Sequence, residues 1–214
     1  MKKRIIFTLL YERGSFVLSR NFRTQKIGDV QWLGSHYNFA KAARFIDELI
    51  LINVSGDPSF DGHFRATLSE VASGVFVPVA AGGGIRTIDD AISLFNFGAD
   101  KILVNQAIFK DPDLVIKLSQ KFGQQSVVGS VDVRRKGGDF QVFTNKGAQA
   151  QPVDYLGELI SQGHLGEVYL NSIDRDGTGQ GMDSGIVEIL DNSFQVPLIL
   201  AGGAGRPEHL LDAI

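Results

Sequence analysis

The chain has 214 residues, of which 43% are hydrophobic and 21% are charged, and these proportions are ordinary for one globular domain with a sizeable core. Its net charge of −3 argues against nucleic acid or an anionic membrane surface as a general partner. The absence of cysteine excludes a disulfide framework and a thiolate metal site, and we expect neither a metal nor a cofactor.

The chain begins with basic residues and a short apolar run at residues 4–10. That run has the length of a strand, lacks a small-residue cleavage site and is followed at once by Glu12 and Arg13. We therefore interpret it as a first strand and not as a signal peptide. No apolar stretch approaches the ~18 residues that a membrane-spanning helix needs, so we expect a cytoplasmic protein without a membrane partner.

Apolar runs of strand length recur at residues 4–10, 48–53, 77–81, 101–105, 126–132, 167–171 and 196–200. They are continuous rather than alternating, as expected for strands that are buried on both faces. Between them lie helical patterns: Thr87 is a candidate N-cap for a helix that Gly98 closes, and Asp111 with Pro112 begins another. This alternation predicts parallel strands with right-handed crossovers.

The sequence also contains an internal repeat. Residues 77–86 resemble residues 196–206, and residues 48–51 resemble residues 167–170, and both pairs of segments begin 119 positions apart. Two similar halves, at about 1–122 and 123–214, predict a single α/β domain with the (β/α)8 TIM-barrel fold in preference to an open doubly wound sheet. Seven strands precede Ile214, so we expect the eighth βα unit to be missing from this chain.

In such barrels the carboxyl ends of the strands form the working face. Glycine-rich turns follow the third strand, at residues 82–84, and the seventh strand, at residues 202–205, and each precedes a helix. Glycine lets the backbone approach an anion closely, and a helix N-terminus offers free N–H groups. Two related turns therefore favour two phosphates on an elongated substrate, although tight turns alone are the plainer explanation of either one.

Carboxylates follow the fifth and sixth strands. Asp132 closes the fifth apolar run, where burial is expected to raise its pKa, and a solvated strand end is the alternative. Asp176 is a candidate general acid or base in the string at residues 172–178, where Gly177 leaves room for substrate; the alternative is an acidic helix-capping loop. The first half has Leu10 at the position equivalent to Asp132, and leucine cannot transfer a proton.

Charged residues stand at the opposite ends of four predicted strands. They are Arg4, Glu48, Lys101 and Glu167. Two bases and two acids are able to close the bottom of a barrel as a ring, whereas ordinary solvated strand starts are the plainer interpretation.

Taken together, these motifs resemble the cyclase subunit (HisF) of imidazole glycerol phosphate synthase, a TIM barrel of the ribulose-phosphate-binding type. The resemblance covers the whole chain in order and rests on residues 4–6, 47–49, 82–86, 98–101, 105, 174–178 and 201–205. It implies a cytoplasmic lyase of histidine biosynthesis that pairs with a HisH-like glutaminase at the N-terminal face of the barrel. Ammonia would enter there, pass through the barrel and attack a bisphosphate at the other face.

The resemblance also assigns roles to residues. It implies an ammonia gate at Arg4, Glu48, Lys101 and Glu167. It implies one phosphate site at Gly84 and Asn105 and another at Gly177, Gly202 and Gly203. The two catalytic aspartates of the family align with Leu10 and Asp132, so Asp132 and Asp176 remain as the polar centres.

Departures from the family pattern affect the predicted chemistry. Apart from Leu10, they are Leu18 for a mobile-loop lysine, Asn53 for an aspartate, Asn171 for a threonine and Ala201 for a serine. Losing the acid–base group at Leu10 predicts weak or no cyclisation while the gate is kept. This combination resembles divergent homologues that deliver ammonia for acetamidino sugars, beside a sugar amidotransferase, in surface-polysaccharide synthesis. Two alternatives remain open: an ordinary histidine-pathway cyclase, and a non-catalytic scaffold that docks a glutaminase and an amidotransferase.

Overall fold

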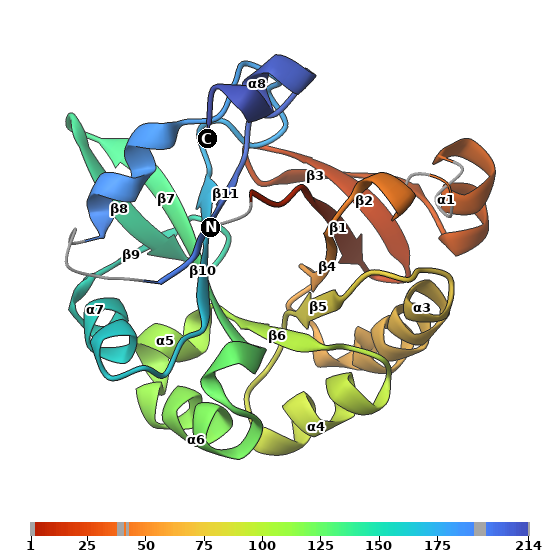
Figure 1. The fold of residues 1–214 in the computed structure, drawn as a ribbon, viewed down its shortest axis with the longest axis horizontal. Helices are drawn as coiled ribbons and strands as arrows, with labels where there is room; N and C mark the ends of the chain where they lie inside the picture. The colour runs from red at the N-terminus through yellow and green to blue at the C-terminus, as the bar shows by residue number, and fades with distance from the viewer. Residues whose placement is uncertain (1–2, 38–40, 42, 191–195, 214) are drawn as a thin grey trace. The chain divides into compact units, whose positions relative to one another are not determined.

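The computed structural model describes residues 3–37, 41, 43–190 and 196–213. The chain divides into two compact units. The first comprises Met1–Leu18 and Thr24–Leu103, and the second comprises Ser19–Arg23 and Val104–Ile214. In Figure 1 the first unit is coloured from red to yellow-green, and most of the second runs from green to blue.

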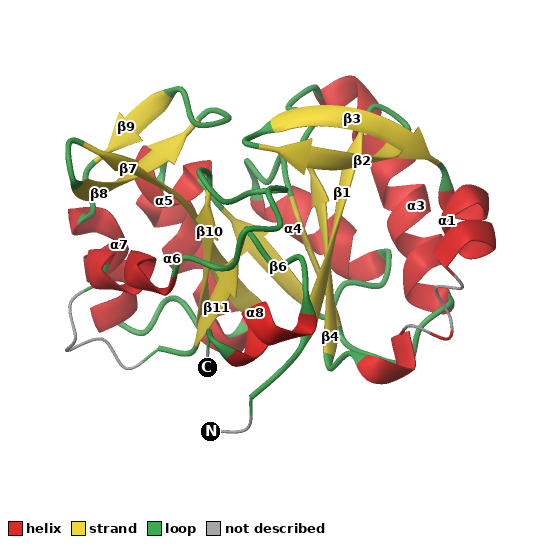
Figure 2. Ribbon diagram, turned by 90° about the horizontal axis from the view of Figure 1, so that it is seen from above, coloured by secondary structure: helices red, strands yellow, loops and turns green. Residues whose placement is uncertain are grey.

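Parallel strands form the core of the first unit. They are β1 (Ile6–Glu12), β4 (Glu48–Asn53), β5 (Val79–Gly82) and β6 (Lys101–Val104), paired in the order β1-β4-β5-β6. Leu49, Ile50 and Leu51 are fully buried in β4, as expected for a strand covered on both faces. At the carboxyl end of β1, β2 (Ser15–Arg20) pairs antiparallel with it, and β3 (Arg23–Gly28) lies beside β2 (Figure 2).

Helices of the first unit are α1 (Val30–Tyr37), α3 (Asp61–Ser73) and α4 (Ile88–Asn96), with 3-10 turns at Ala43–Phe45 and Pro58–Phe60. Thr87 caps α4 as predicted: its hydroxyl accepts from the Asp90 backbone, and the Asp90 carboxylate accepts in return from the Thr87 backbone. Gly98 follows the end of α4 with a φ of 102°. The local sequence therefore fixes both ends of this helix.

The second unit repeats the parallel arrangement with β7 (Val127–Lys136), β10 (Glu167–Ser172) and β11 (Leu198–Ala201), paired in that order. β8 (Asp139–Thr144) pairs antiparallel with the second half of β7, and β9 (Gln149–Gln151) pairs with β8. Helices α5 (Gln106–Lys110), α6 (Pro112–Phe122) and α7 (Asp154–Ser161) lie together in Figure 1, and α8 (Pro207–Leu211) follows β11. Further 3-10 turns are Gln124–Ser126 and Ser184–Ile189.

The structure confirms an α/β fold with parallel strands at all seven predicted positions, and two boundaries differ in ways that matter for function. β1 begins at Ile6, so Arg4 precedes that strand instead of standing in it. β7 continues to Lys136 because β8 pairs with its second half, so Asp132 lies within β7 and not at its end. Among the residues that the structure describes, none of the helices is long and apolar enough to cross a membrane.

Candidate functional site

Asp132 lies on β7 between two asparagine side chains. The strand register places Asn171 of β10 beside Asp132. Nδ2 of Asn171 donates to Oδ1 of Asp132 at 3.3 Å, and Nδ2 of Asn105, which follows β6, donates to Oδ2 at 3.0 Å. Both carboxylate oxygens therefore accept a hydrogen bond from a neutral amide.

The surroundings of Asp132 shift its proton affinity in the direction predicted from the sequence. Burial raises the pKa of Asp132 to about 6, because the ionised form loses water contacts. The hydrogen bonds from Asn171 and Asn105 act the other way on the pKa, and the negative charge of Asp176 adds to the rise. A carboxyl group that titrates close to neutral pH is suited to general acid or base catalysis.

Asp176, the other candidate acid or base, is engaged with the tip of the β2–β3 hairpin at residues 19–23. Its Oδ2 accepts from the Ser19 hydroxyl at 2.5 Å and from the Phe22 backbone N–H at 3.1 Å. The side-chain amide of Asn21 donates to the carbonyls of Ile173 and Asp174 at 2.9 and 3.0 Å. The carboxylate of Asp176 thus anchors the hairpin tip in this structure.

Gly177 allows this close approach of the hairpin tip. Its φ is 65°, and a Cβ atom on it would collide with the carbonyl oxygen of Ser19. Residues with a side chain rarely adopt this left-handed conformation, so glycine is required here by packing alone. Packing therefore explains why position 177 is a glycine, independently of the predicted phosphate contact.

The glycine-rich turns after β5 and β11 are shaped by their neighbours in the same way. A Cβ atom on Gly83 would collide with the Asn53 carbonyl at the end of β4, and one on Gly202 would lie 2.7 Å from the Ser172 carbonyl at the end of β10. Gly203, which follows Gly202, packs against the Gly181 backbone. Close packing of the backbone thus accounts for part of both motifs.

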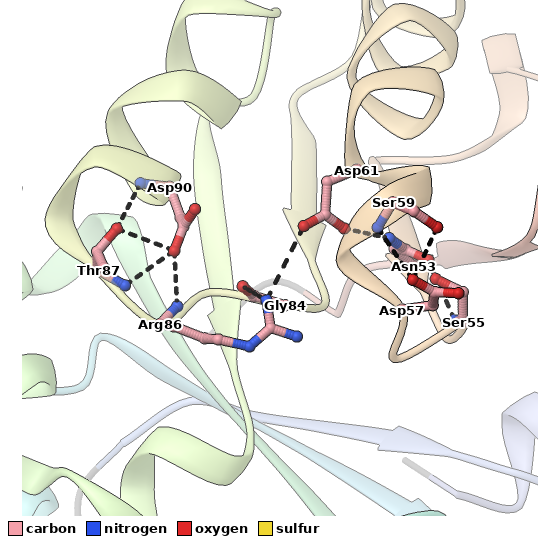
Figure 3. Close-up of polar contacts among 9 residues, drawn as sticks. All are labelled: Asn53, Ser55, Asp57, Ser59, Asp61, Gly84, Arg86, Thr87 and Asp90. Atoms are coloured by element: carbon pink, nitrogen blue, oxygen red, sulfur yellow. Dashed lines mark hydrogen bonds and ion pairs between the residues drawn. The ribbon is translucent and has the colours of Figure 1, made fainter.

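Acidic residues surround the turn at Gly84, as Figure 3 shows. Asp61 at the start of α3 lies near Gly84, and its Oδ2 is 3.9 Å from Nη1 of Arg86. Nη1 of Arg86 also donates to the Gly84 carbonyl at 3.2 Å. Burial raises the pKa of Asp61, and the positive charge of Arg86 opposes that rise.

Asn53 connects this turn to α3. Its Nδ2 donates to Oδ1 of Asp61 at 3.2 Å, and its Oδ1 accepts from the backbone N–H and the hydroxyl of Ser55 at 3.1 and 2.6 Å (Figure 3). A carboxylate at position 53 would face Asp61 with like charge, whereas the neutral amide donates to it. The asparagine is therefore compatible with Asp61 in a way that an aspartate is not.

A charged cluster lies at the N-terminal ends of the first unit's strands. Nη1 of Arg4 donates to Oε2 of Glu48 at 2.9 Å, and Nζ of Lys101 donates to both carboxylate oxygens at 3.0 Å. The side chain of Glu48 is only 3% exposed. In the second unit Glu167 begins β10, as Glu48 begins β4. One buried carboxylate thus holds two cations whose side chains reach solvent.

No group of three or more histidine, cysteine, aspartate or glutamate side chains that would suit a metal ion occurs in the described ranges. The chemistry available from these residues is proton transfer at Asp132, hydrogen bonding at the strand ends and charge recognition at Glu48.

A sequence profile of the family described as "Histidine biosynthesis protein" matches residues 4–214. The chain belongs to this family. It is 43% identical to a provisionally named imidazole glycerol phosphate synthase subunit hisF2 of Parasynechococcus marenigrum, over all of this chain and 80% of that protein. It is 34% identical to the HisF subunit of Chlorobium limicola, over 99% of this chain and 84% of that protein, and 35% identical to that of Pyrobaculum aerophilum, over 94% and 79%.

Within this histidine biosynthesis family member, the predicted site residues fall into separate groups. Asp132 and Asn105 come together in the second unit, and Arg4, Glu48 and Lys101 come together in the first. Asn105 was predicted as a phosphate contact, and here its side-chain amide bonds to Asp132 and to the Ser130 carbonyl. The phosphate and gate assignments remain predictions.

Three residues of the family member's site gave no strong signal in the sequence. Asn171 was noted only as a departure from the family pattern, yet it contacts Asp132. Ser19 and Asp61 lie outside the seven predicted strands and the two glycine-rich turns, and their roles depend on contacts across long sequence separations. The internal repeat offered one usable signal, because it places Asn171 at the end of a strand paired with the strand of Asp132.

Proposed function

We propose that this protein is the cyclase-like subunit of a glutamine amidotransferase pair. A glutaminase supplies ammonia at the N-terminal ends of its strands, and the ammonia is delivered to a reaction at the carboxyl ends. The reaction that fits best is amidation of a sugar in surface-polysaccharide synthesis, beside a sugar amidotransferase. The proposal takes the chain as a (β/α)8 barrel of two similar halves, and the equivalent parallel pairings inside each unit support this.

The observation that carries the proposal is the cluster around Glu48. A buried carboxylate is costly unless it is paired, and this one is paired with two cations from different strands. Packing alone does not call for so much charge at strand ends, whereas a gate that admits a small neutral molecule would use it. Glu167, at the equivalent position in the second unit, is the proposed fourth member of the gate.

Exposed apolar side chains near the same strand ends support a protein partner there. Ile5 precedes β1, Phe45 precedes β4 and Phe76 precedes β5, and all three are exposed, Phe76 completely. Large exposed apolar side chains at neighbouring strand ends are typical of a surface that another protein covers. A glutaminase that docks on them would release ammonia beside Glu48.

The carboxyl ends of the strands support weak cyclisation. Leu10 pairs in register with Val17 and Ile52, so apolar residues surround the position where the family has an aspartate. Of the two equivalent positions, 10 and 132, the proposal therefore assigns proton transfer to Asp132 alone.

An ordinary cyclase of histidine biosynthesis is the second candidate. It is favoured by the names of the relatives, which include imidazole glycerol phosphate synthase subunits at 34% and 35% identity. It requires that another group replaces the missing carboxylate at Leu10. It also requires that the phosphate contacts proposed at Gly84, Gly177, Gly202 and Gly203 bind a bisphosphate.

Copurification of the full chain with a glutaminase, followed by glutamine-driven assays on a bisphosphate and on an acetamido sugar with its amidotransferase, tests the proposal. We expect sugar amidation driven by glutamine and little imidazole product. Glu48→Gln should lower the glutamine-driven rate while turnover with added ammonium salt persists, and the exposed Glu70→Gln serves as control. Rapid formation of the imidazole product would support the ordinary cyclase and overturn the sugar assignment.

A further inference from the structure

We propose that Asn171 and Asn105 are positioning residues that clamp the Asp132 carboxylate in one orientation, so that a defined lone pair of each oxygen faces the ligand. This inference rests on the proposed function, because it deepens the role of Asp132 in it. It also gives Asn105 a task that differs from the phosphate contact implied by family resemblance.

The orientation of the Asn105 amide is fixed by its partners. Its Nδ2 donates to the Ser130 carbonyl at 2.9 Å and to Oδ2 of Asp132 at 3.0 Å. A carbonyl oxygen can only accept, so the nitrogen of Asn105 must point towards Ser130 and Asp132. Both amide hydrogens are then used within the protein, and the remaining oxygen of the side chain cannot donate to a phosphate.

Asn171 holds the other side of the carboxylate. It lies beside Asp132 in the parallel pairing of β10 with β7, and its Nδ2 donates to Oδ1 at 3.3 Å. Donors on both oxygens, one from β10 and one from the residue that precedes α5, restrict rotation of the carboxylate about its last bond. Asn171, Asn105 and Asp132 are each partly exposed, so this group of side chains is not sealed inside the core.

The two amides of the clamp also offset the free-energy cost of ionising Asp132 near another negative charge. The negative charge of Asp176 favours the protonated form of Asp132. The two amides favour the ionised form, because each donates to an oxygen that carries the charge. Without them the carboxylate would rotate and would hold its proton to a higher pH.

NMR titration of the full chain labelled with 13C at the aspartate carboxyl groups tests the clamp, with Asp132→Asn identifying the resonance. In Asn171→Leu and in Asn105→Leu we expect the Asp132 midpoint to rise by about one pH unit, because each variant removes one donor that stabilises the ionised carboxylate. Leucine is similar in size to asparagine, so the packing changes little. Asn171→Gln, which keeps an amide, should recover part of the shift. Gln151→Leu, a half-buried amide on β9 that bonds to Thr144, should leave the midpoint unchanged.

Midpoints that stay within about 0.2 unit of the original in both leucine variants would overturn the clamp. If a leucine variant does not fold, Asn171→Ala removes the same donor with less bulk, and a thermal melt checks that it is folded. The titration does not depend on turnover. A failed amidation assay with shifted midpoints would therefore reject the proposed function and keep the clamp. Successful amidation with unchanged midpoints would keep the proposed function and reject the clamp.

Discussion

Leu10 in the first unit and Asp132 in the second occupy equivalent positions with opposite polarity. Leu10 pairs in register with Ile52 of β4, and Asp132 pairs with Asn171 of β10. The offset of 119 residues in the sequence repeat relates Ile52 to Asn171. The parallel backbone pairing at these positions is therefore the same in both units, and the side chains there differ.

The hairpins that follow extend this comparison. Leu10 pairs with Val17 of β2, and Asp132 pairs with Phe143 of β8. Leu10 thus has apolar neighbours on both sides, whereas Asp132 has an amide on β10 that donates to it. Parallel strand pairing depends on backbone groups, so it allows an apolar residue in one repeat and a carboxylate in the other. Proton transfer is accordingly expected from the second unit.

The largest expected effect comes from removing the charge at Asp132, which leaves a neutral side chain there as at Leu10. Asp132→Asn should lower the ammonia-dependent rate about 10²- to 10⁴-fold, because a side-chain amide does not act as a general acid or base near neutral pH. Steady-state kinetics with ammonium salt measure this loss. The exposed Asp154→Asn makes the same charge change in the same unit and should have no effect. An unaffected rate in Asp132→Asn would favour a non-catalytic docking scaffold.

Stability should depend on pH through Asp132. Its pKa is raised from 3.8 to about 6 on folding, so the folded state binds the proton more tightly than the unfolded state. The free energy of unfolding should therefore fall as pH rises from 4 to above 6, by at most about 3 kcal/mol from this group. Urea unfolding across this range checks the slope.

Asp132→Asn should remove that part of the pH dependence. The oxygen of the new asparagine can accept from Asn105, and its nitrogen can donate to Asn171 once the Asn171 amide has flipped, so the variant can form hydrogen bonds with both neighbours. An identical pH profile in the variant would show that Asp132 is not the group responsible.

Leu10→Asp sharpens the comparison from the other side. A carboxylate beside Ile52 and Val17 has no amide donor at either register position, so we expect unfolding to become easier by about 1–3 kcal/mol at pH 8. The loss should shrink at pH 4, where the group is protonated. Leu10→Asn is the matched control, and its loss should not depend on pH.

The same variant tests descent from a cyclase. A large gain in imidazole product in Leu10→Asp would support divergence from an ancestor with two carboxylates. Equal rates in Leu10→Asp and Leu10→Asn would contradict it.

The smallest effect concerns Asp176, the second carboxylate of the second unit. Ser19→Ala removes one donor to Asp176 and leaves that of the Phe22 backbone, so unfolding should become easier by about 1 kcal/mol. Chemical denaturation measures this value, with the exposed Ser161→Ala as control. A value near zero would show that the Ser19 hydroxyl does not hold the hairpin tip in solution.

The sequence predicted the parallel strands well because they are continuous apolar runs, as in β4 and β10. It missed β2, β3, β8 and β9, which are short or partly polar and owe their pairing to neighbouring strands. For the same reason it placed Asp132 at a strand end, although β7 continues beyond it to pair with β8.

The candidate site was predictable where one residue's chemistry suffices. Burial was expected for Asp132 because it closes an apolar run, and the structure places it partly buried within β7. Glu48 was predicted as a charged residue at a strand start, but its burial between two cations was not predicted. The amide of Asn171 and the hydroxyl of Ser19 have no distinctive pattern, because their roles arise only when separate segments meet. Asp61 beside Gly84 was missed for the same reason.

Transfer of labelled nitrogen tests the central claim most directly. The full chain is combined with its copurified glutaminase, amide-15N glutamine, a bisphosphate and an acetamido sugar with its amidotransferase, and the products are analysed by mass spectrometry. We predict that 15N appears in the sugar product, that this depends on Glu48, and that little enters an imidazole. Label that accumulates in the imidazole product, at a rate that the Leu10→Asp variant does not improve, would contradict the account.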